Sequence, residues 1–560
     1  MNTIPEKQTA LQLVGPDELK LNTDKEVLSP GPYQILARVE AVGLCFSDLK
    51  LLKQFDAHAR KSEVLCGIEP QALAENPAYV PGTKPTVPGH EACCTIVAVG
   101  DHVKHHRIGQ RVLVQTDYRW LKTAASNAAF GYNFEGALQQ YVLMDERIII
   151  EPDSGESFLI PVEDHLSASA AALVEPWACV ESSYISKERA AIKTGGKLLV
   201  VADKGRAVKG VQEAFDRAGA PAGVTVICAE PSQAAAHANA QKADTCESLP
   251  NEHFDDIVYF GSDKTTIETL NDKLAGGGIM NIVLGGSSIG APVSVGVGRV
   301  HYGLTRWIGT LGDNAADSYC TIPQTGEVRK DDKVLVVGAA GPMGQMHVLR
   351  VICSGIDGLT VVGTDYDDHR LEGLSHKAAP PAKERGVKLS LVNPQKQPVT
   401  EAFSYVAIMA PVAPLVAQAI NDSADNALIN IFAGIPAPVK QDIDLDTYIA
   451  RRCFMFGTSG SRLEDMKIVL DKVTRGQLDV NTSVDAVSGM AGAADGIRAV
   501  ENRTLAGKII VYPALPNLPL TTLDDLAAAY PTIAEKCPND LWTQAAEEEL
   551  LKNCRLTNDD

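Results

Sequence analysis

The stretch KVLVVGAAGPMGQMHVLRVI, residues 333–352, decides the fold. It begins as an apolar strand, turns at Gly338, Gly341 and Gly344, and continues with the spacing of an apolar helix. A second apolar strand ends in Asp365, 21 residues after Gly344. Glycines in such a turn let backbone N–H groups approach a pyrophosphate, and an acid after the next strand can accept hydrogen bonds from a ribose. The stretch therefore predicts a Rossmann-type module that binds a dinucleotide.

The turn and its acid also indicate which dinucleotide binds. A carboxylate at position 365 would repel the 2′-phosphate of NADP, and the first arginine after it is Arg370. We therefore expect NAD(H). The residues expected to contact this cofactor are Gly338, Gly341, Pro342, Met343, Gly344 and Asp365.

The same alternation of strands and helices occurs earlier in the chain. Residues 195–201, GGKLLVV, resemble residues 331–337, DDKVLVV, and the likeness continues through later strands of both segments. A duplicated nucleotide-binding fold explains such an internal repeat. In the earlier copy, however, Ala202, Gly205 and Val208 stand where the later copy has its three glycines. A β-branched valine leaves little room for close backbone packing, so we expect this copy to be a scaffold that binds no dinucleotide.

These patterns divide the chain into five segments. The predicted fold class is α/β, with a mainly antiparallel β domain followed by two tandem doubly wound parallel-sheet modules. A chain of 560 residues needs several such units, because one hydrophobic core does not grow to this size. We expect the β domain at 1–185, the degenerate module at 186–322, the dinucleotide-binding module at 323–475, a segment returning to the β domain at 476–513, and a helical extension at 514–560.

Composition restricts the class of partner. Apolar residues make up 45% of the chain and charged residues 22%, a balance typical of globular proteins. The formal net charge of -19 would repel phosphate backbones and anionic lipids, which argues against nucleic-acid and membrane partners and favours a small-molecule substrate. The chain begins without a secretory pattern and has no apolar stretch long enough to span a bilayer, so we expect a cytoplasmic protein. Its scattered cysteines form no CxxC pair, which indicates buried thiols.

Three short motifs carry residues of the types that bind zinc. They are VGLCFSDLK at 42–50, VPGHE at 87–91 and ALVEPW at 172–177. Three protein ligands with one open position, drawn from thiolates, imidazoles and carboxylates, are typical of catalytic zinc. In this order, the motifs resemble those of the medium-chain zinc-dependent dehydrogenases, with the alcohol and sorbitol dehydrogenase-like branches closest. The segments GYNFEGALQQYV, AGPMG and LPLTTLDDL are also similar to those of L-sorbose 1-phosphate reductase-like proteins.

The resemblance implies one catalytic zinc. Its ligands would be Cys45 and His90, completed by Glu91 or Glu175, with water or substrate in the open position. One thiolate and one carboxylate offset the charge of the dication and leave a Lewis acid that lowers the pKa of a bound alcohol. Many relatives also hold a structural zinc through four closely spaced cysteines after the His-Glu motif. This chain has no such group, so we expect no structural zinc.

The resemblance also implies catalytic and cofactor roles. Ser47 would pass on the proton of the alcohol, and Asp48 would orient the ring of His90. Together with Glu91, these two residues are the candidate catalytic residues. Lys508 matches a basic position that in relatives lies near the cofactor phosphates, which suits a contact with the pyrophosphate.

Three further features lie near the metal motifs in sequence. The stretch from Leu51 to Lys84 is longer than in relatives, and we expect it to form a flap that faces the substrate. Phe46 fills the variable position beside Cys45, and the resemblance implies that the side chain at this position shapes the substrate pocket. The three histidines of the turn DHVKHHRIG, residues 101–109, are expected to be solvated.

For the whole chain, the resemblance implies a GroES-like catalytic domain and an enzyme. The expected reaction is the zinc-dependent, NAD(H)-linked interconversion of a secondary alcohol (polyol, sugar or sugar phosphate) and its ketone by hydride transfer. Two other classes remain open, an NAD-binding sensor or structural homologue without turnover and a zinc-independent carbonyl reductase. Relatives pair Rossmann sheets between subunits, and the extra module could supply this contact within the chain. We therefore expect a monomer with an internal pseudo-dimer, or a homodimer.

Overall fold

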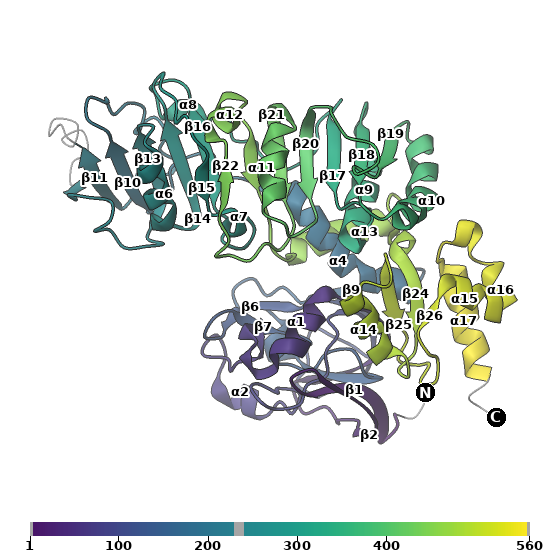
Figure 1. Ribbon diagram of the computed structural model, residues 1–560. Coiled ribbons are helices and arrows are strands. Elements are labelled where there is room, and N and C mark those ends of the chain that lie inside the picture. The colour runs from purple at the N-terminus through teal and green to yellow at the C-terminus, as the bar shows by residue number, and fades with distance from the viewer. Residues whose placement is uncertain (1–3, 229–239, 557–560) are drawn as a thin grey trace. The chain divides into compact units, whose positions relative to one another are not determined.

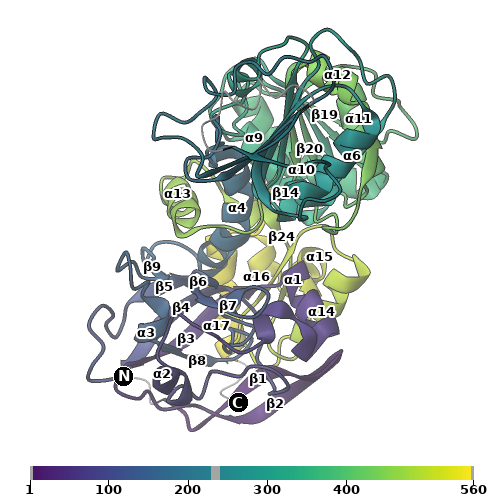
Figure 2. The ribbon, with the colours of Figure 1, turned by 90° about the vertical axis from the view of Figure 1, so that its left-hand side faces the viewer.

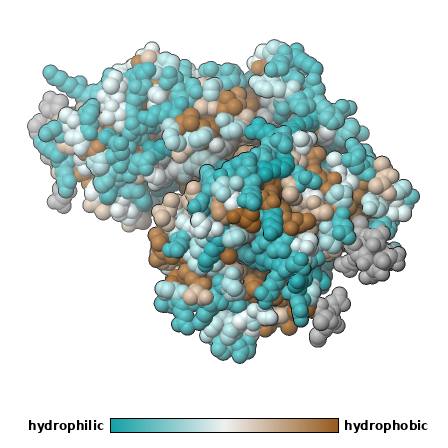
Figure 3. All heavy atoms as spheres, turned by 60° about the horizontal axis from the view of Figure 1, so that its bottom comes forward, coloured by the Kyte–Doolittle hydropathy of each residue, from teal (hydrophilic) through white to brown (hydrophobic). Residues whose placement is uncertain are grey.

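The computed structural model describes residues 4–228 and 240–556. The chain forms two compact units (Figure 1). The first unit contains residues 1–179 and 461–560, and the second contains residues 180–460. Among the described residues, no helix combines the length and apolar character that crossing a bilayer requires. Hydrophilic side chains cover most of the face seen in Figure 3, with apolar groups between them.

The first unit is built around an eight-stranded, mostly antiparallel sheet. Its central strands read QILARVEAVG and EACCTIVAV, and such apolar and β-branched runs suit strands buried in a sheet. The strand order is β26-β24-β25-β3-β4-β5-β9, and β8 also pairs with β3. The bounds are β3 Gln34–Gly43, β4 Glu91–Val99, β5 Arg111–Val114, β8 Tyr141–Asp145, β9 Leu159–Pro161, β24 Val484–Ser488, β25 Lys508–Val511 and β26 Thr521–Thr522.

The other elements of this unit are two strand pairs and a set of helices. The strand pairs are β1 Lys7–Gly15 with β2 Glu18–Glu26, and β6 Asp117–Lys122 with β7 Asn127–Ala129. The helices are α1 Phe46–Gln54, α2 Pro70–Ala74, α3 Glu146–Ile149, α13 Leu463–Thr474, α14 Ala493–Asn502, α15 Leu523–Ala529, α16 Pro531–Ala534 and α17 Gln544–Leu556. Helix α4, Ala168–Ile185, begins in this unit and ends in the second.

The register of the large sheet brings distant segments together. Strands β3 and β4 are antiparallel, so Gly43 at the end of β3 lies opposite Glu91 at the start of β4. Strand β25 pairs with the same end of β3, where Ile510 lies opposite Gly43. Residues that follow β3, precede β4 or begin β25 therefore meet in one place.

The second unit contains two six-stranded parallel sheets, seen in the upper part of Figure 1. The first has the order β12-β11-β10-β13-β14-β16, and the second has the order β19-β18-β17-β20-β21-β23. We call these sheets and their helices the first and second module. The strands of the first are β10 Lys197–Ala202, β11 Gly223–Cys228, β12 Gln241–Lys242, β13 Phe254–Phe260, β14 Leu274–Val283 and β16 Arg306–Thr310. Those of the second are β17 Lys333–Val337, β18 Thr360–Thr364, β19 Lys388–Val392, β20 Phe403–Ile408, β21 Ser423–Ile431 and β23 Phe454–Phe456.

The two modules repeat one topology. In each sheet the first three strands of the module run in order from the centre to one edge, and the last three run from the centre to the other edge. This is the doubly wound strand order. The described helices of the modules are α6 Lys264–Lys273, α7 Val297–Tyr302 and α8 Ala316–Tyr319 in the first, and α9 Pro342–Ile352, α10 Asp368–Glu384, α11 Pro414–Asn421 and α12 Leu445–Ala450 in the second. The predicted fold class is therefore confirmed.

The C-terminal helices pack into the core of the first unit rather than resting on its surface. Trp542 is fully buried and donates a hydrogen bond from Nε1 to the Tyr512 hydroxyl. The buried carboxylate of Glu547, on α17, accepts hydrogen bonds from the backbone N–H groups of Ala168 (2.6 Å) and Ser169 (2.8 Å). Because these N–H groups begin α4, Glu547 caps that helix from a distant segment. Figure 2 shows α16 and α17 on the same unit as β3 and β4.

Replacing Glu547 with alanine is expected to lower the free energy of unfolding by about 2 kcal/mol, because two helix N–H groups lose a buried, charged acceptor. Denaturant unfolding followed by circular dichroism measures this change. The matched control is Glu548→Ala, which removes an exposed carboxylate from the next position of the same helix and should leave stability unchanged. Equal stability of the two variants would show that the cap contributes nothing.

Candidate metal and cofactor sites

Two of the three zinc motifs meet where β3 ends and β4 begins. Cys45 lies two residues beyond β3 and caps α1, while His90 and Glu91 lie at the start of β4. The Cys45 sulfur, one His90 ring nitrogen and one Glu91 oxygen all lie within 4.8 Å of one another. In the described part of the chain, this is the only group of three or more such side chains with a spacing that could hold a metal ion.

Two residues of α1 organise this group. Asp48 accepts a hydrogen bond from the Cys45 backbone N–H (3.0 Å), and its other oxygen lies 3.1 Å from Nδ1 of His90. The Ser47 hydroxyl lies 3.1 Å from Sγ of Cys45 and 3.2 Å from Nε2 of His90. Burial lowers the pKa of His90, but the charge and hydrogen bond of Asp48, together with Tyr132 and Cys45, outweigh burial and raise that pKa well above its usual value. The first turn of α1 thus fixes both the orientation and the charge environment of the imidazole.

Only one of the two carboxylate oxygens of Glu91 has a hydrogen-bond partner. Its Oε1 accepts a hydrogen bond from Nζ of Lys508 at 2.6 Å, and Lys508 also donates to the backbone oxygen of Leu44 at 2.7 Å. Its Oε2 is buried and has no hydrogen-bond partner. A Cβ atom at Gly43 would lie 2.1 Å from Oε2, so a glycine is needed there to leave room for the carboxylate. The predicted contact of Lys508 with cofactor phosphates stays a prediction, and its pairing with Glu91 was not predicted.

Glu175, the other predicted carboxylate ligand, is not part of the metal-binding group. It lies on α4, and its Oε1 accepts a long hydrogen bond from Sγ of Cys179 at 3.8 Å. Burial raises the pKa of Glu175 to about 7, and the charge of Glu91 adds to this, while His90 and Lys508 oppose it. The geometry therefore favours Glu91 over Glu175 as the third ligand.

Several polar side chains near His90 were missed by the sequence analysis. The Tyr132 ring lies 5.9 Å from the His90 ring and 5.1 Å from that of His58, measured between centroids. The guanidinium of Arg60 lies over Tyr132 and pairs with Asp117 at 2.9 Å. His58 and Arg60 belong to the 51–84 stretch, so part of this stretch lies near His90, and its role as a flap that faces the substrate stays a prediction. No spacing pattern in the sequence points to this cluster.

The predicted glycine turn lies at the carboxyl ends of the strands in the second module. Gly338 follows β17 with a left-handed backbone (φ 79°), and Gly341 caps the N-terminus of α9. A Cβ at Gly344 would lie 2.2 Å from the Gly338 oxygen, so the close packing of α9 on the turn requires a glycine. At Gly341 the nearest atom would be 3.8 Å away, which leaves open space beside the helix N-terminus. Pro342 and Met343 form the first turn of α9.

Asp365 lies where the prediction requires, directly after β18 and beside the glycine turn. One of its carboxylate oxygens accepts a hydrogen bond from the Ala340 N–H at 3.2 Å, and the other accepts one from the Asp367 N–H at 3.3 Å. The strand order reverses between β17 and β20, and dinucleotides bind at the carboxyl ends of strands at such a point. The turn and Asp365 therefore fit the adenosine and pyrophosphate half of NAD(H).

The first module differs from the second at the same place. Residues 203–222, between β10 and β11, contain no helix, so this module lacks the helix N-terminus that would receive a pyrophosphate. The side chain of Arg206 crosses the turn instead and donates hydrogen bonds to the Gly285 oxygen (3.1 Å) and the Ser287 hydroxyl (2.5 Å). These contacts favour the expectation that the first module is a scaffold.

One expectation about the histidines of the 101–109 turn is wrong. His106 is buried, with Nδ1 at 2.9 Å from Glu146 and Nε2 at 2.8 Å from the Ser157 hydroxyl. Burial lowers the pKa of His106, although Glu146 opposes this shift. Partners supplied by later segments, invisible in the local pattern, account for the burial.

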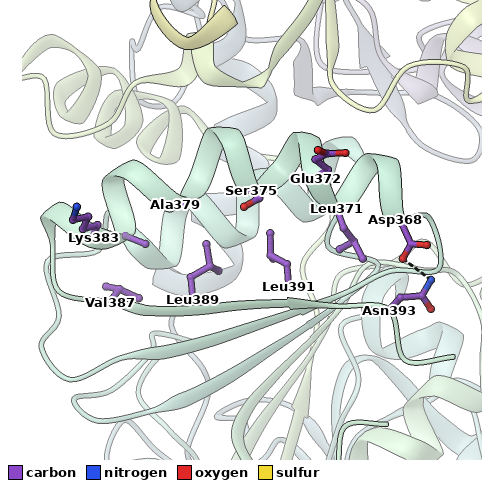
Figure 4. A pocket seen from close by; sticks show the side chains of 11 residues that line it. Asp368, Leu371, Glu372, Ser375, Ala379, Lys383, Val387, Leu389, Leu391 and Asn393 are labelled. Carbon is purple, nitrogen blue, oxygen red and sulfur yellow. Dashed lines mark hydrogen bonds between the residues drawn. The ribbon is translucent and has the colours of Figure 1, made fainter. Parts of the chain in front are cut away.

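A groove between α10 and β19 lies outside the predicted cofactor contacts. Leu371 on the helix and Leu389 and Leu391 on the strand line it, and a hydrogen bond between Asp368 and Asn393 lies at one end (Figure 4). No residue of the glycine turn lines this groove.

Comparisons with known proteins show which proteins this chain is similar to. Residues 31–153 match the family model of the alcohol dehydrogenase GroES-like domain. The chain is 25% identical over 337 residues to L-sorbose 1-phosphate reductase of Klebsiella pneumoniae, which covers 55% of this chain and 76% of that protein. It is 30% identical over 106 residues to sorbitol dehydrogenase of Bos taurus, which covers 19% of this chain and 24% of the relative. Two Escherichia coli relatives are matched over 57% and 36% of their lengths.

A solved structure shows the same fold. The structure superimposes on 2R,3R-butanediol dehydrogenase from Bacillus subtilis with a TM-score of 0.50 and 14% sequence identity, covering 90% of this chain and 100% of that chain. The chain therefore carries an alcohol dehydrogenase GroES-like domain together with Rossmann-like parallel sheets, as the medium-chain dehydrogenases do, and the resemblance found in its motifs is confirmed.

Proposed function

We propose that this protein is a zinc-dependent, NAD(H)-linked dehydrogenase that interconverts a secondary alcohol on a polyol, sugar or sugar phosphate and the corresponding ketone. The observation that carries the proposal is the grouping of Cys45, His90 and Glu91. The Ser47 hydroxyl is within hydrogen-bond distance of both Cys45 and His90. The names of two relatives, L-sorbose 1-phosphate reductase and sorbitol dehydrogenase, support the substrate class.

The residues present fit a zinc ion. Buried carboxylate oxygens normally have partners, whereas Oε2 of Glu91 has none, and a cation at this position would satisfy it. A thiolate, an imidazole and a carboxylate form a ligand set that catalytic zinc uses, with a fourth position left for substrate. Zinc bound there would supply a Lewis acid that lowers the pKa of an alcohol. The absence of a second, structural zinc remains part of the proposal.

The chain's own residues would hold the ligands and move the proton. Asp48 accepts the Nδ1 proton of His90, which leaves the Nε2 lone pair available as a ligand. The Ser47 hydroxyl is close to both ligand atoms, so it can accept the hydroxyl proton of the substrate and pass it on. Lys508 neutralises part of the charge of Glu91, so one carboxylate can bind the metal without cancelling its acidity.

The cluster beyond His90 favours a substrate rich in hydroxyl groups. Arg60 offers several N–H donors, Asp117 offers acceptors, and the neutral Tyr132 hydroxyl offers both. Burial raises the pKa of Tyr132, which keeps this hydroxyl protonated. Such a mixed set can bind neighbouring hydroxyl groups on a polyol or sugar.

Native mass spectrometry of the purified chain, with and without NADH, tests the proposal. We expect one zinc and one NADH per polypeptide, and a particle of one chain in which the two modules form an internal pseudo-dimer. NADH formation with sorbitol and other polyols, and NADH oxidation with ketose phosphates, tests turnover. Protein purified without chelators that carries no zinc would rule out the zinc mechanism, and two bound NADH molecules would contradict the scaffold role of the first module.

A further inference from the structure

The two modules of the second unit join through equivalent elements. Strand β15, Val293–Val295, pairs antiparallel with β22, Gln441–Ile443, and each directly precedes the corresponding helix, α7 or α12. The edge strands β16 and β23 also lie next to each other. A two-fold axis between identical subunits brings equivalent strands together in an antiparallel pair. Here both halves belong to one chain.

Across this seam, α7 of the first module reaches two loops of the second. Nδ1 of His301 lies 3.2 Å from the backbone oxygen of Ile431, and its ring packs edge-on against Phe432. The Tyr302 hydroxyl lies so close to Gly434 that a Cβ there would be 2.6 Å from it. Arg306, just after α7, donates a hydrogen bond to the Gly457 oxygen at 3.0 Å.

The opposite contact exists as well. Asp446, on α12 of the second module, accepts hydrogen bonds from the backbone N–H groups of Ile289 (2.9 Å) and Gly290 (2.7 Å), in the loop after β14. Each module therefore holds the loop that follows the fifth strand of the other. In the first module, the loop after β14 is bonded to Arg206, which crosses the turn after β10. In the second module, the loop after β21 belongs to a sheet whose glycine turn is open.

The loops held by α7 lie at the carboxyl ends of β21 and β23. In a doubly wound sheet, the strands on one side of the reversal hold the adenosine half of a dinucleotide, and those on the other side hold the second mononucleotide. The glycine turn and Asp365 belong to the adenosine side. The loops that begin at Phe432 and Gly457 therefore belong to the nicotinamide side.

We propose that the first module acts as a built-in partner subunit, and that His301 and Tyr302 of its helix α7 are positioning residues that hold the nicotinamide-side loops of the second module. This inference rests on the proposed NAD(H) binding. It explains why the chain contains a first module that lacks a dinucleotide-binding turn: the first module shapes the dinucleotide site of the second module.

Affinities for NADH and for ADP-ribose, measured by isothermal titration calorimetry, test the inference. ADP-ribose contains the adenosine half and pyrophosphate but no nicotinamide. His301→Ala is expected to weaken NADH about tenfold, since it removes a hydrogen bond and a ring contact behind the loop, and to leave ADP-ribose unchanged. His301→Gln keeps an amide donor near the Ile431 oxygen and should restore most of the NADH affinity. Tyr302→Ala, at a partly exposed position, provides a second variant if His301→Ala does not fold.

The control is His253→Ala, which removes a half-exposed histidine before β13 of the same module whose side chain contacts Lys197 and Phe254 and not the second module. It should change neither affinity. Equal weakening of both ligands by His301→Ala and Tyr302→Ala, or no weakening of either, would overturn the positioning role. Wild-type protein that binds neither NADH nor ADP-ribose would instead overturn the proposed function, and this inference with it.

Discussion

Cys45→Ser is expected to lower kcat/KM by at least about 10³-fold and to remove most of the zinc from the purified protein. Sulfur is the softest donor in the group, and the hydroxyl of serine is neither deprotonated nor a comparable zinc ligand at neutral pH. The remaining pair, His90 and Glu91, offers only two ligands. Metal analysis by mass spectrometry and steady-state rates with the best polyol substrate measure the two effects.

Cys66→Ser is the matched control, because it makes the same chemical change at an exposed cysteine of the 51–84 stretch. It should keep both zinc and activity. NADH affinity provides a further check, since the dinucleotide turn lies in the other unit and should survive the loss of zinc. If Cys45→Ser keeps full activity and a full complement of metal, zinc catalysis at this site must be abandoned.

The parts of the site that could be predicted from the sequence are the local ones. The turn from Gly338 to Gly344 and Asp365 lie within one strand, helix and strand, so their spacing alone indicates what the backbone can bind. Cys45 and His90 became predictable through the order of their motifs. The repeat of the two modules was visible because equivalent strands keep similar sequences.

The parts that escaped prediction depend on contacts between distant segments. Lys508 meets Glu91 only because β25 and β4 both pair with β3, a register that no local pattern encodes. The cluster of Tyr132 and Arg60 likewise requires the fold of the 51–84 stretch. In the first module, the loss of glycines predicts that no dinucleotide binds, but no sequence pattern predicts that the helix after β10 is missing or that Arg206 bonds to the loop after β14.

Gly341→Ala is expected to weaken NADH binding about 100-fold while leaving the fold unchanged. In the structure, the added methyl would meet only the Gly338 oxygen, at 3.8 Å, so the protein can accommodate it. The same methyl would occupy the space at the N-terminus of α9, where a pyrophosphate must approach the backbone N–H groups. Fluorescence titration with NADH and thermal unfolding measure affinity and stability on the same samples.

Substitutions at two other glycines of the same module distinguish a loss of NADH binding from a loss of stability. Gly373→Ala adds a methyl to open space on α10, so NADH affinity should not change and helix propensity should slightly favour the variant. Gly344→Ala would force a Cβ to within 2.2 Å of the Gly338 oxygen, so stability and affinity should fall together. Only a ligand seated at the helix N-terminus makes Gly341→Ala lose affinity without losing stability. Wild-type affinity in Gly341→Ala would mean that the dinucleotide does not bind at this turn.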